Sequence, residues 1–206
     1  MVGALVRAQL RRAGAVAVIP IVVGAVVAGA GWAAATAWPM VVTMTLVTWL
    51  EQVFVICVGV SAASALTGDP LVELHESTST SFRSVQVLRA AILAVSGVIG
   101  AIVMFVPLHL AGVWPRDDGW ATVLVPAGAM LFVIAVAWAV AAFVGTVSAT
   151  TIAVIAAWMF LAMLWDPYVL MLAIQRGVPL LAAGVLVILG LRRLGDSEQN
   201  ISRRPA

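Results

Sequence analysis

Long apolar runs, each close to the length that crosses a bilayer, constrain this chain more than any other feature. A membrane-spanning helix needs about 20 predominantly apolar residues. Short polar breaks separate six such runs, at 14–34, 40–66, 90–112, 121–144, 149–165 and 177–191. Because a backbone in lipid must satisfy its own hydrogen bonds, each run is predicted to be a helix. The predicted fold is all-α, a polytopic integral membrane protein with six transmembrane helices.

Composition excludes the main soluble alternatives. Hydrophobic residues make up 64% of the 206 positions and charged residues only 10%, against about 25% charged residues in an ordinary soluble domain. A soluble chain of this length cannot bury so much apolar surface in one core. Soluble enzymes, nucleic-acid-binding proteins and disulfide-stapled secreted domains are therefore excluded. The single cysteine, Cys57, has no partner within the chain.

Polar segments flank and interrupt the transmembrane domain, which is predicted to cover 14–191. Residues 1–13 carry three arginines in a weakly amphipathic pattern, which indicates a helix lying on the membrane surface. A basic start followed by an apolar run is also typical of a cleaved signal peptide, but this run is too long and further spans follow it. A polar coupling segment is predicted at 67–89, a short interfacial or re-entrant helix at 168–176, and a polar tail at 192–206.

The distribution of arginine predicts the orientation of the chain. With six spans, both termini lie on one side of the membrane, and that side receives nine of the eleven basic residues, all of them arginine. The other side receives only Arg116 and Arg176. Because basic residues are enriched in cytoplasmic loops, both termini are expected in the cytoplasm. The absence of lysine and the abundance of Ala, Val and Gly are typical of a GC-rich bacterial genome, so a bacterial plasma membrane is expected.

Tryptophans support the same orientation. Indole rings favour the membrane interface, where the ring is buried and its N–H stays hydrated. Five tryptophans fall at the predicted outer boundary: Trp32, Trp38, Trp114, Trp120 and Trp165. The outer boundary is therefore predicted from two independent patterns.

Catalytic and metal-binding patterns are missing from the sequence. The two histidines, His75 and His109, are predicted on opposite sides of the membrane and cannot share a metal. Neither a Gly-x-Ser-x-Gly frame nor paired intramembrane carboxylates are present, which disfavours a membrane-embedded hydrolase or lipid transferase. A GxxxxGK[ST] phosphate loop is impossible without lysine. We expect a protein that is not an enzyme and has no cofactor of its own, so any ATP must be hydrolysed by another chain.

The segment 67–89 has the strongest local signals. Asp69 followed by Pro70 is a strong helix start, because Asp accepts free N–H groups and Pro fits the first helical position. Acidic residues in the first turns suit the helix dipole, and the Ser/Thr run at 77–81 ends the helix. A second helix is predicted to start near residue 81 and to continue into the third span. The acids and the leucines beside them favour a docking surface over a solvated loop. The predicted docking residues are Asp69, Leu71, Glu73, Leu74 and Glu76.

This layout resembles the bacterial membrane permeases of ATP-binding-cassette exporters of the second type, which have a surface helix, six spans and a coupling helix between spans two and three. The stretch Gly68-Asp69-Pro70-Leu71-Val72-Glu73-Leu74, followed by Arg83, is similar to the Asp-Pro-x-x-Glu-Leu…Arg pattern of that family. The similarity in sequence is confined to about 67–89. It implies that the coupling segment contacts cytoplasmic nucleotide-binding ATPase subunits that bind ATP. It also implies a dimer with a second copy or a paralogue.

Glu51 is the one ionisable residue deep in a predicted span. A charge at that depth costs about 2.5 kcal/mol or more, so the carboxyl is expected to face protein or water, or to be protonated. Thr45, Thr48 and Gln52 lie around it at helical spacing and form a polar stripe. Two interpretations remain open, a substrate pathway or subunit interface, and a carboxyl satisfied by a neighbouring helix.

These patterns predict the permease subunit of an exporter that moves a hydrophobic or amphipathic substrate, such as a drug, lipid or peptide, out of the cell. The alternative is the substrate-binding membrane subunit of an energy-coupling-factor importer of a vitamin or metal. That class has a similar length, six spans and a ligand pocket on the outer side, but it gives the acidic segment no clear task. Its docking face would be the small-residue pairs Gly24 with Ala28 and Ala25 with Gly29.

Overall fold

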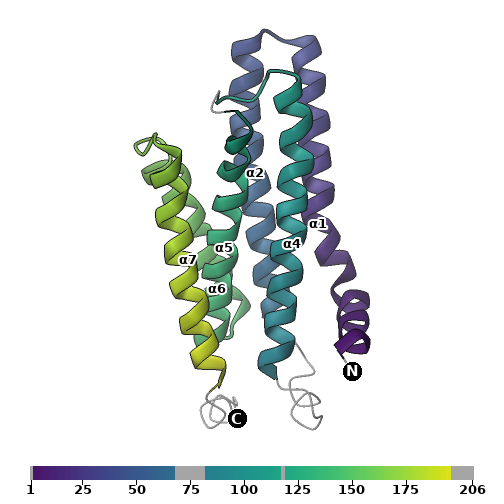
Figure 1. The fold of residues 1–206 in the computed structure, drawn as a ribbon, viewed down its shortest axis with the longest axis vertical. Helices are drawn as coiled ribbons and strands as arrows, with labels where there is room; N and C mark the ends of the chain where they lie inside the picture. Colours follow the sequence, from purple (N-terminus) through teal and green to yellow (C-terminus); the bar gives the residue numbers. More distant parts are fainter. Residues whose placement is uncertain (1, 68–81, 117–118, 196–206) are drawn as a thin grey trace.

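The computed structural model describes residues 2–67, 82–116 and 119–195, and no strand occurs within these ranges (Figure 1). The elements are α1 (Val2–Ala37), α2 (Met40–Leu66), α4 (Phe82–Leu110), the 3₁₀ turn η1 (Gly119–Val123), α5 (Leu124–Phe143), α6 (Val147–Met159), the π-helical turn η2 (Phe160–Trp165) and α7 (Leu172–Gly195). The predicted all-α fold is confirmed for the described part of the chain.

Six helical stretches of the described residues are long and apolar enough to cross a membrane. They are Val16–Ala37, Met40–Leu66, Arg83–Leu110, Gly119–Phe143, Val147–Trp165 and Leu172–Leu194. The turn η1 joins α5 in the fourth stretch, and η2 extends α6 in the fifth. The predicted set of six apolar helices is therefore confirmed, and it indicates a multi-pass membrane protein.

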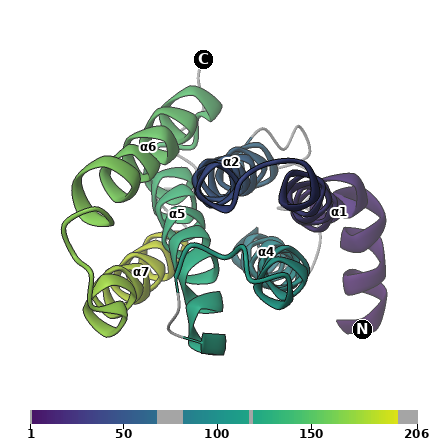
Figure 2. The same ribbon diagram turned by 90° about the horizontal axis from the view of Figure 1, so that it is seen from above.

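Two short helices were predicted from the sequence, at 1–13 and at 168–176, and both differ from the observed structure. Residues 2–13 are the first turns of α1, and Figure 2 shows these turns tilting away from the bundle. Their position on a membrane surface stays a prediction. A separate helix at 168–176 is not observed, because irregular backbone follows η2 up to residue 171 and residues 172–176 are the first turns of α7. Pro167 has no N–H group with which to continue the preceding helix.

The coupling segment lies mostly outside the described residues. Residues 68–81 are not described, so the coupling helix and its docking residues stay predictions, as does the tail beyond residue 195. The docking residues concerned are Asp69, Leu71, Glu73, Leu74 and Glu76. The stem behind them is described, since α4 begins at Phe82. Gln86 Nε2 donates to the Leu66 carbonyl at 3.1 Å, so the start of α4 is tied to the end of α2.

The helices pack as two groups that meet where α2 contacts α5 and α6 and where α4 contacts α5. Figure 2 shows α1, α2 and α4 on one side, and α5, α6 and α7 on the other. Within the groups, α1 packs most extensively against α4, and α5 packs most extensively against α7. One apolar core crosses the junction. Its fully buried members include Phe54, Val58, Met104, Met130 and Val133.

Glycines let α1 and α4 approach at backbone distance. A Cβ added at Gly24 would collide with the carbonyl of Gly100, and a Cβ at Gly100 would collide with the α1 backbone. Small residues at such crossings are a main source of helix association in membranes. Of the predicted small-residue pairs, Gly24 and Ala28 are buried within the chain, whereas Ala25 and Gly29 are exposed.

The two helix groups are staggered along the bundle axis. We call the end opposite the start of α1 and the end of α7 the outer end, after the orientation that the arginine distribution predicts. Figure 1 shows the α1–α2 connection extending well beyond the α6–α7 connection at this end. Glu51 follows Met40, the first residue of α2, by eleven positions, or about 16 Å along the axis. The stagger therefore brings Glu51 level with the segment that joins η2 to α7.

Candidate functional site

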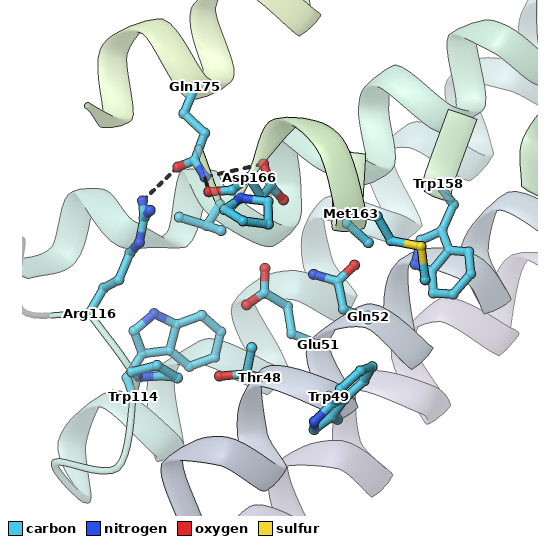
Figure 3. Close-up of a pocket in the computed structure, with 14 residues that line it drawn as sticks. Thr48, Trp49, Glu51, Gln52, Trp114, Arg116, Trp158, Met163, Asp166 and Gln175 are labelled. Carbon is cyan, nitrogen blue, oxygen red and sulfur yellow. Dashed lines mark hydrogen bonds between the residues drawn. The ribbon is translucent and has the colours of Figure 1, made fainter. Parts of the chain in front are cut away.

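A cavity of about 320 Å³ lies at the outer end, between α2, the α6–η2 span, the segment before η1 and the start of α7 (Figure 3). Its polar lining comes from four separate parts of the chain. The polar lining residues are Thr48, Glu51, Gln52, Arg116, Asp166 and Gln175. The aromatic lining residues are Trp49, Trp114 and Trp158. The cavity thus combines charge, hydrogen-bonding groups and apolar rings in one space.

Two residues that line this cavity, Glu51 and Trp158, have a buried polar atom without a hydrogen-bond partner among the described residues. The Glu51 side chain is 6% exposed, and its Oε1 atom has no hydrogen-bond partner within residues 2–67, 82–116 and 119–195. Figure 3 shows the carboxylate pointing from α2 into the cavity, between Gln52 and Trp114. A buried polar atom without a partner is uncommon in native structures and costs roughly 1–3 kcal/mol. The Oε1 atom of Glu51 is therefore placed to bind a ligand that supplies the missing hydrogen bond or positive charge.

The stripe predicted around Glu51 divides between the cavity and the lipid-facing surface. Thr48 and Gln52 line the cavity with Glu51, and we call these three residues the α2 wall. Thr45 is exposed and does not line it, and its hydroxyl donates to the Val41 carbonyl at 2.9 Å. Six positions along an α-helix rotate a side chain by about 240°, so Thr45 and Glu51 face different directions.

Tryptophans form much of the apolar lining. Trp114 is buried at 5% exposure, Trp158 is half-buried, and Trp49 is exposed. The Nε1 atom of Trp158 is itself buried and without a hydrogen-bond partner. Sequence reasoning placed Trp114 in the interfacial belt and did not single out Trp49 or Trp158. The thioether of Met163 adds a further soft, polarizable group to the lining.

Four residues beside the cavity form a hydrogen-bonded network, and we call Arg116, Asp166, Gln175 and Arg176 the outer network. Arg176 is 2% exposed and binds Asp166 through two parallel hydrogen bonds of 2.8 and 2.9 Å. Gln175 Nε2 donates to the Asp166 carbonyl and to its Oδ1 atom at 3.2 and 3.1 Å, and Arg116 Nη1 donates to Gln175 Oε1 at 2.6 Å. Figure 3 shows Gln175 between Arg116 and Asp166. The network therefore ties the segment before η1, the end of η2 and the start of α7 together.

Sequence reasoning did not find the outer network. It used Arg116 and Arg176 only as loop charges that set the orientation. A signal was available, because Asp166 and Arg176 flank the break before the sixth span and opposite charges in an apolar setting are expected to pair. The sequence alone did not indicate the bridging role of Gln175.

Local sequence features hold the outer network in place. Gly128 on α5 leaves room for Arg176, whose Cδ atom would lie 3.0 Å from a Cβ added there. Pro179 inside α7 provides no N–H for the carbonyl of Gln175, four positions earlier. Trp165 Nε1 donates to that carbonyl at 2.8 Å instead. The freed carbonyl is thereby satisfied, as the apolar environment requires.

The cavity offers a carboxyl group, side-chain amides and indole rings, which can bind a ligand by charge, hydrogen bonds and apolar contact. Within residues 2–67, 82–116 and 119–195, no three His, Cys, Asp or Glu residues lie close enough to hold a metal ion. The charge of Asp166 is paired with Arg176, and Arg116 is bonded to Gln175. The carboxyl of Glu51 is the acidic group left to meet a ligand.

No protein-family model, curated protein or solved structure matches the chain. The functional inference therefore rests on the sequence pattern and on the geometry of the cavity.

Proposed function

We propose that this chain is the membrane-spanning permease subunit of an ATP-binding-cassette exporter, which moves a hydrophobic or amphipathic substrate out of a bacterial cell. The observation that carries the proposal is the cavity around Glu51. A six-helix apolar bundle has no structural need for a buried carboxyl without a partner, and burying one lowers stability. Ionisable groups inside membrane proteins are rare and usually belong to substrate or ion pathways.

The proposed energy source is a pair of cytoplasmic ATPase subunits that dock on the coupling segment. This part of the proposal rests on the resemblance of residues 67–89 to the exporter family. The segment joins the end of α2 to the start of α4, and α2 also carries Glu51. The hydrogen bond from Gln86 to Leu66 supports a tight connection at that end. A shift of the coupling segment would then move α2 and change the access to the cavity.

In this proposal both termini face the cytoplasm and the cavity opens toward the outside of the plasma membrane. Two copies of the chain, or the chain and a paralogue, form the transport unit. ATP binding closes the ATPase pair and tilts the spans, and substrate leaves at the outer end. The chain itself acts as a transport subunit and hydrolyses no ATP.

A second candidate is the substrate-binding membrane subunit of an energy-coupling-factor importer. One observation favours it, because the cavity is built within a single chain and lies at the end opposite the start of α1. A ligand-capturing subunit needs a self-contained outer pocket of this kind. The direction of transport separates the two candidates.

The test is purification of the tagged chain from its native host under mild detergent, followed by transport in proteoliposomes. An exporter subunit should co-purify with an ATPase and drive ATP-dependent movement of a hydrophobic dye away from the ATPase side. Glu51→Gln should reduce this movement, and the variant should still insert and co-purify. Isolation as a stable monomer without an ATPase, and without ATP-driven dye movement, would exclude the exporter. Uptake toward the ATPase side would favour the importer.

A further inference from the structure

We propose that the cavity around Glu51 binds a small organic ammonium ion, whose charge meets the Glu51 carboxylate and whose apolar groups lie against tryptophan rings. The inference names the substrate class of the proposed transport site, and it rests on that function for its biological meaning. The binding itself is a property of the chain alone.

The charge of the ligand is inferred from the carboxylate oxygen of Glu51 to which the surrounding side chains donate no hydrogen bond. Arg176 is paired with Asp166, and Arg116 donates to the neutral amide of Gln175, so neither arginine donates a hydrogen bond to Glu51 Oε1. Glu51 Oε1 has no partner and the side chain is 94% buried, since its exposed fraction is 6%. The charges of Arg176 and Arg116 act on this carboxylate through space. A cation that enters the cavity can in addition contact the Oε1 atom directly.

The aromatic lining selects an organic cation over a metal ion. Tryptophan is the strongest cation–π partner among the aromatic side chains, and aromatic cages are a common solution for binding substituted ammonium groups. Trp114 and Trp158 place two largely enclosed rings in the cavity, and Trp49 adds an exposed one. Calcium and magnesium ions instead require several oxygen ligands. Within the described residues, no three His, Cys, Asp or Glu side chains lie together as ligands of a metal ion would.

The size of the cavity limits the ligand. A volume of about 320 Å³ is at the lower end of the range for small-molecule sites, which is about 300–1,000 Å³. One aryl- or alkyl-substituted ammonium ion fills such a space. A whole lipid or a long peptide does not fit within it. The inference therefore narrows the proposed substrates from drug, lipid or peptide to a compact amine.

The experiment measures equilibrium binding to the full chain in lipid nanodiscs, without ATP and without partner subunits. The probes are benzyltrimethylammonium, its uncharged isostere neopentylbenzene, and the anion benzenesulfonate, and empty nanodiscs correct for partition into lipid. The cation should bind saturably, with at least about tenfold higher affinity than the other two probes.

Variants connect the binding to named residues. Glu51→Gln keeps the shape of the side chain and should weaken cation binding by about 30-fold or more, because the charge opposite the ligand is lost. Trp158→Leu should weaken it by about fivefold through loss of a cation–π contact. Trp32→Leu is the matched control, since Trp32 is exposed and lies outside the cavity lining. Thermal unfolding of each variant checks that it is folded.

Three results would overturn the inference. Neopentylbenzene could bind as tightly as the cation, Glu51→Gln could leave cation affinity unchanged, or benzenesulfonate could bind best through Arg116. If Glu51→Gln does not fold, the Trp158→Leu and Trp32→Leu pair decides, and equal affinities would reject the site. The transport proposal can fail separately. If the chain has no ATPase partner, it should still bind the cation in preference to the other two probes.

Discussion

The outer network and the α2 wall face one cavity, but they treat their carboxyl groups in opposite ways. Asp166 accepts two hydrogen bonds from a buried arginine and a third from Gln175. Glu51 is more deeply buried, and one of its oxygens has no partner. A paired buried carboxylate holds segments together, whereas an unpaired one is a cost that folding alone does not explain. We therefore assign a structural role to the outer network and a binding role to the α2 wall.

The largest expected effect is the loss of one partner from the outer network. Arg176→Met leaves Asp166 without its arginine in a largely buried position, and should lower the free energy of unfolding by about 3 kcal/mol. Denaturant titration in detergent micelles, followed by helix signal, measures the change. The double variant Arg176→Met, Asp166→Leu should recover most of the loss, because no unpaired charge remains. A single variant as stable as the parent chain would remove the structural role of the pair.

The next effect tests the space that α5 provides for Arg176. Gly128→Ala puts a methyl group 3.0 Å from Arg176 Cδ and 3.3 Å from its Cβ and Cγ. We expect a loss of about 1–2 kcal/mol of stability from overpacking, since this part of the arginine stem is fully buried. Gly29→Ala is the matched control, because nothing lies within 4 Å of a Cβ at that position. Equal effects of the two variants, measured by the same titration, would mean that Gly128 serves no packing role.

A smaller effect tests the hydrogen bond that satisfies the Gln175 carbonyl. Trp165→Phe removes the indole donor and should destabilise the chain by about 1 kcal/mol. In a Pro179→Ala background the helix N–H returns, so the same substitution should cost clearly less. A double-mutant cycle of thermal unfolding measures this coupling. Additive effects of the two substitutions would contradict the account of how α7 tolerates its proline.

The features that could be predicted from the sequence are those that depend on local physics. Each apolar helix satisfies its own backbone in lipid, so the runs alone predicted the six helices. Glu51 was found in the same way, because a carboxyl in an apolar run is unusual whatever surrounds it. Thr45 lies on another face of α2 than Glu51, since repeated steps of three residues drift around the helix, and its role at a subunit interface stays a prediction.

Features that depend on contacts between distant segments were not found. Trp114, Asp166 and Gln175 come from two breaks in the apolar pattern that are some fifty residues apart, and no local signal shows that they meet. Their meeting depends on the stagger of the two helix groups and on the room that Gly128 leaves on α5. The helix predicted at 168–176 failed for a related reason, because hydrogen bonds to Gln175 and Arg176 hold the irregular segment in place.

The smallest expected effect is a gain in stability. It is the most direct test of the difference between the α2 wall and the outer network. Glu51→Gln replaces an unpaired acid with a neutral amide, which is less costly to bury, so stability should rise by up to about 1 kcal/mol while cation binding falls. Asp166→Asn weakens a satisfied ion pair, so the same chemical change should lower stability at that position. Both variants are measured by denaturant titration in the same detergent. Destabilisation by both would show that Glu51 already has a structural partner, and the distinction between the two sides of the cavity would then disappear.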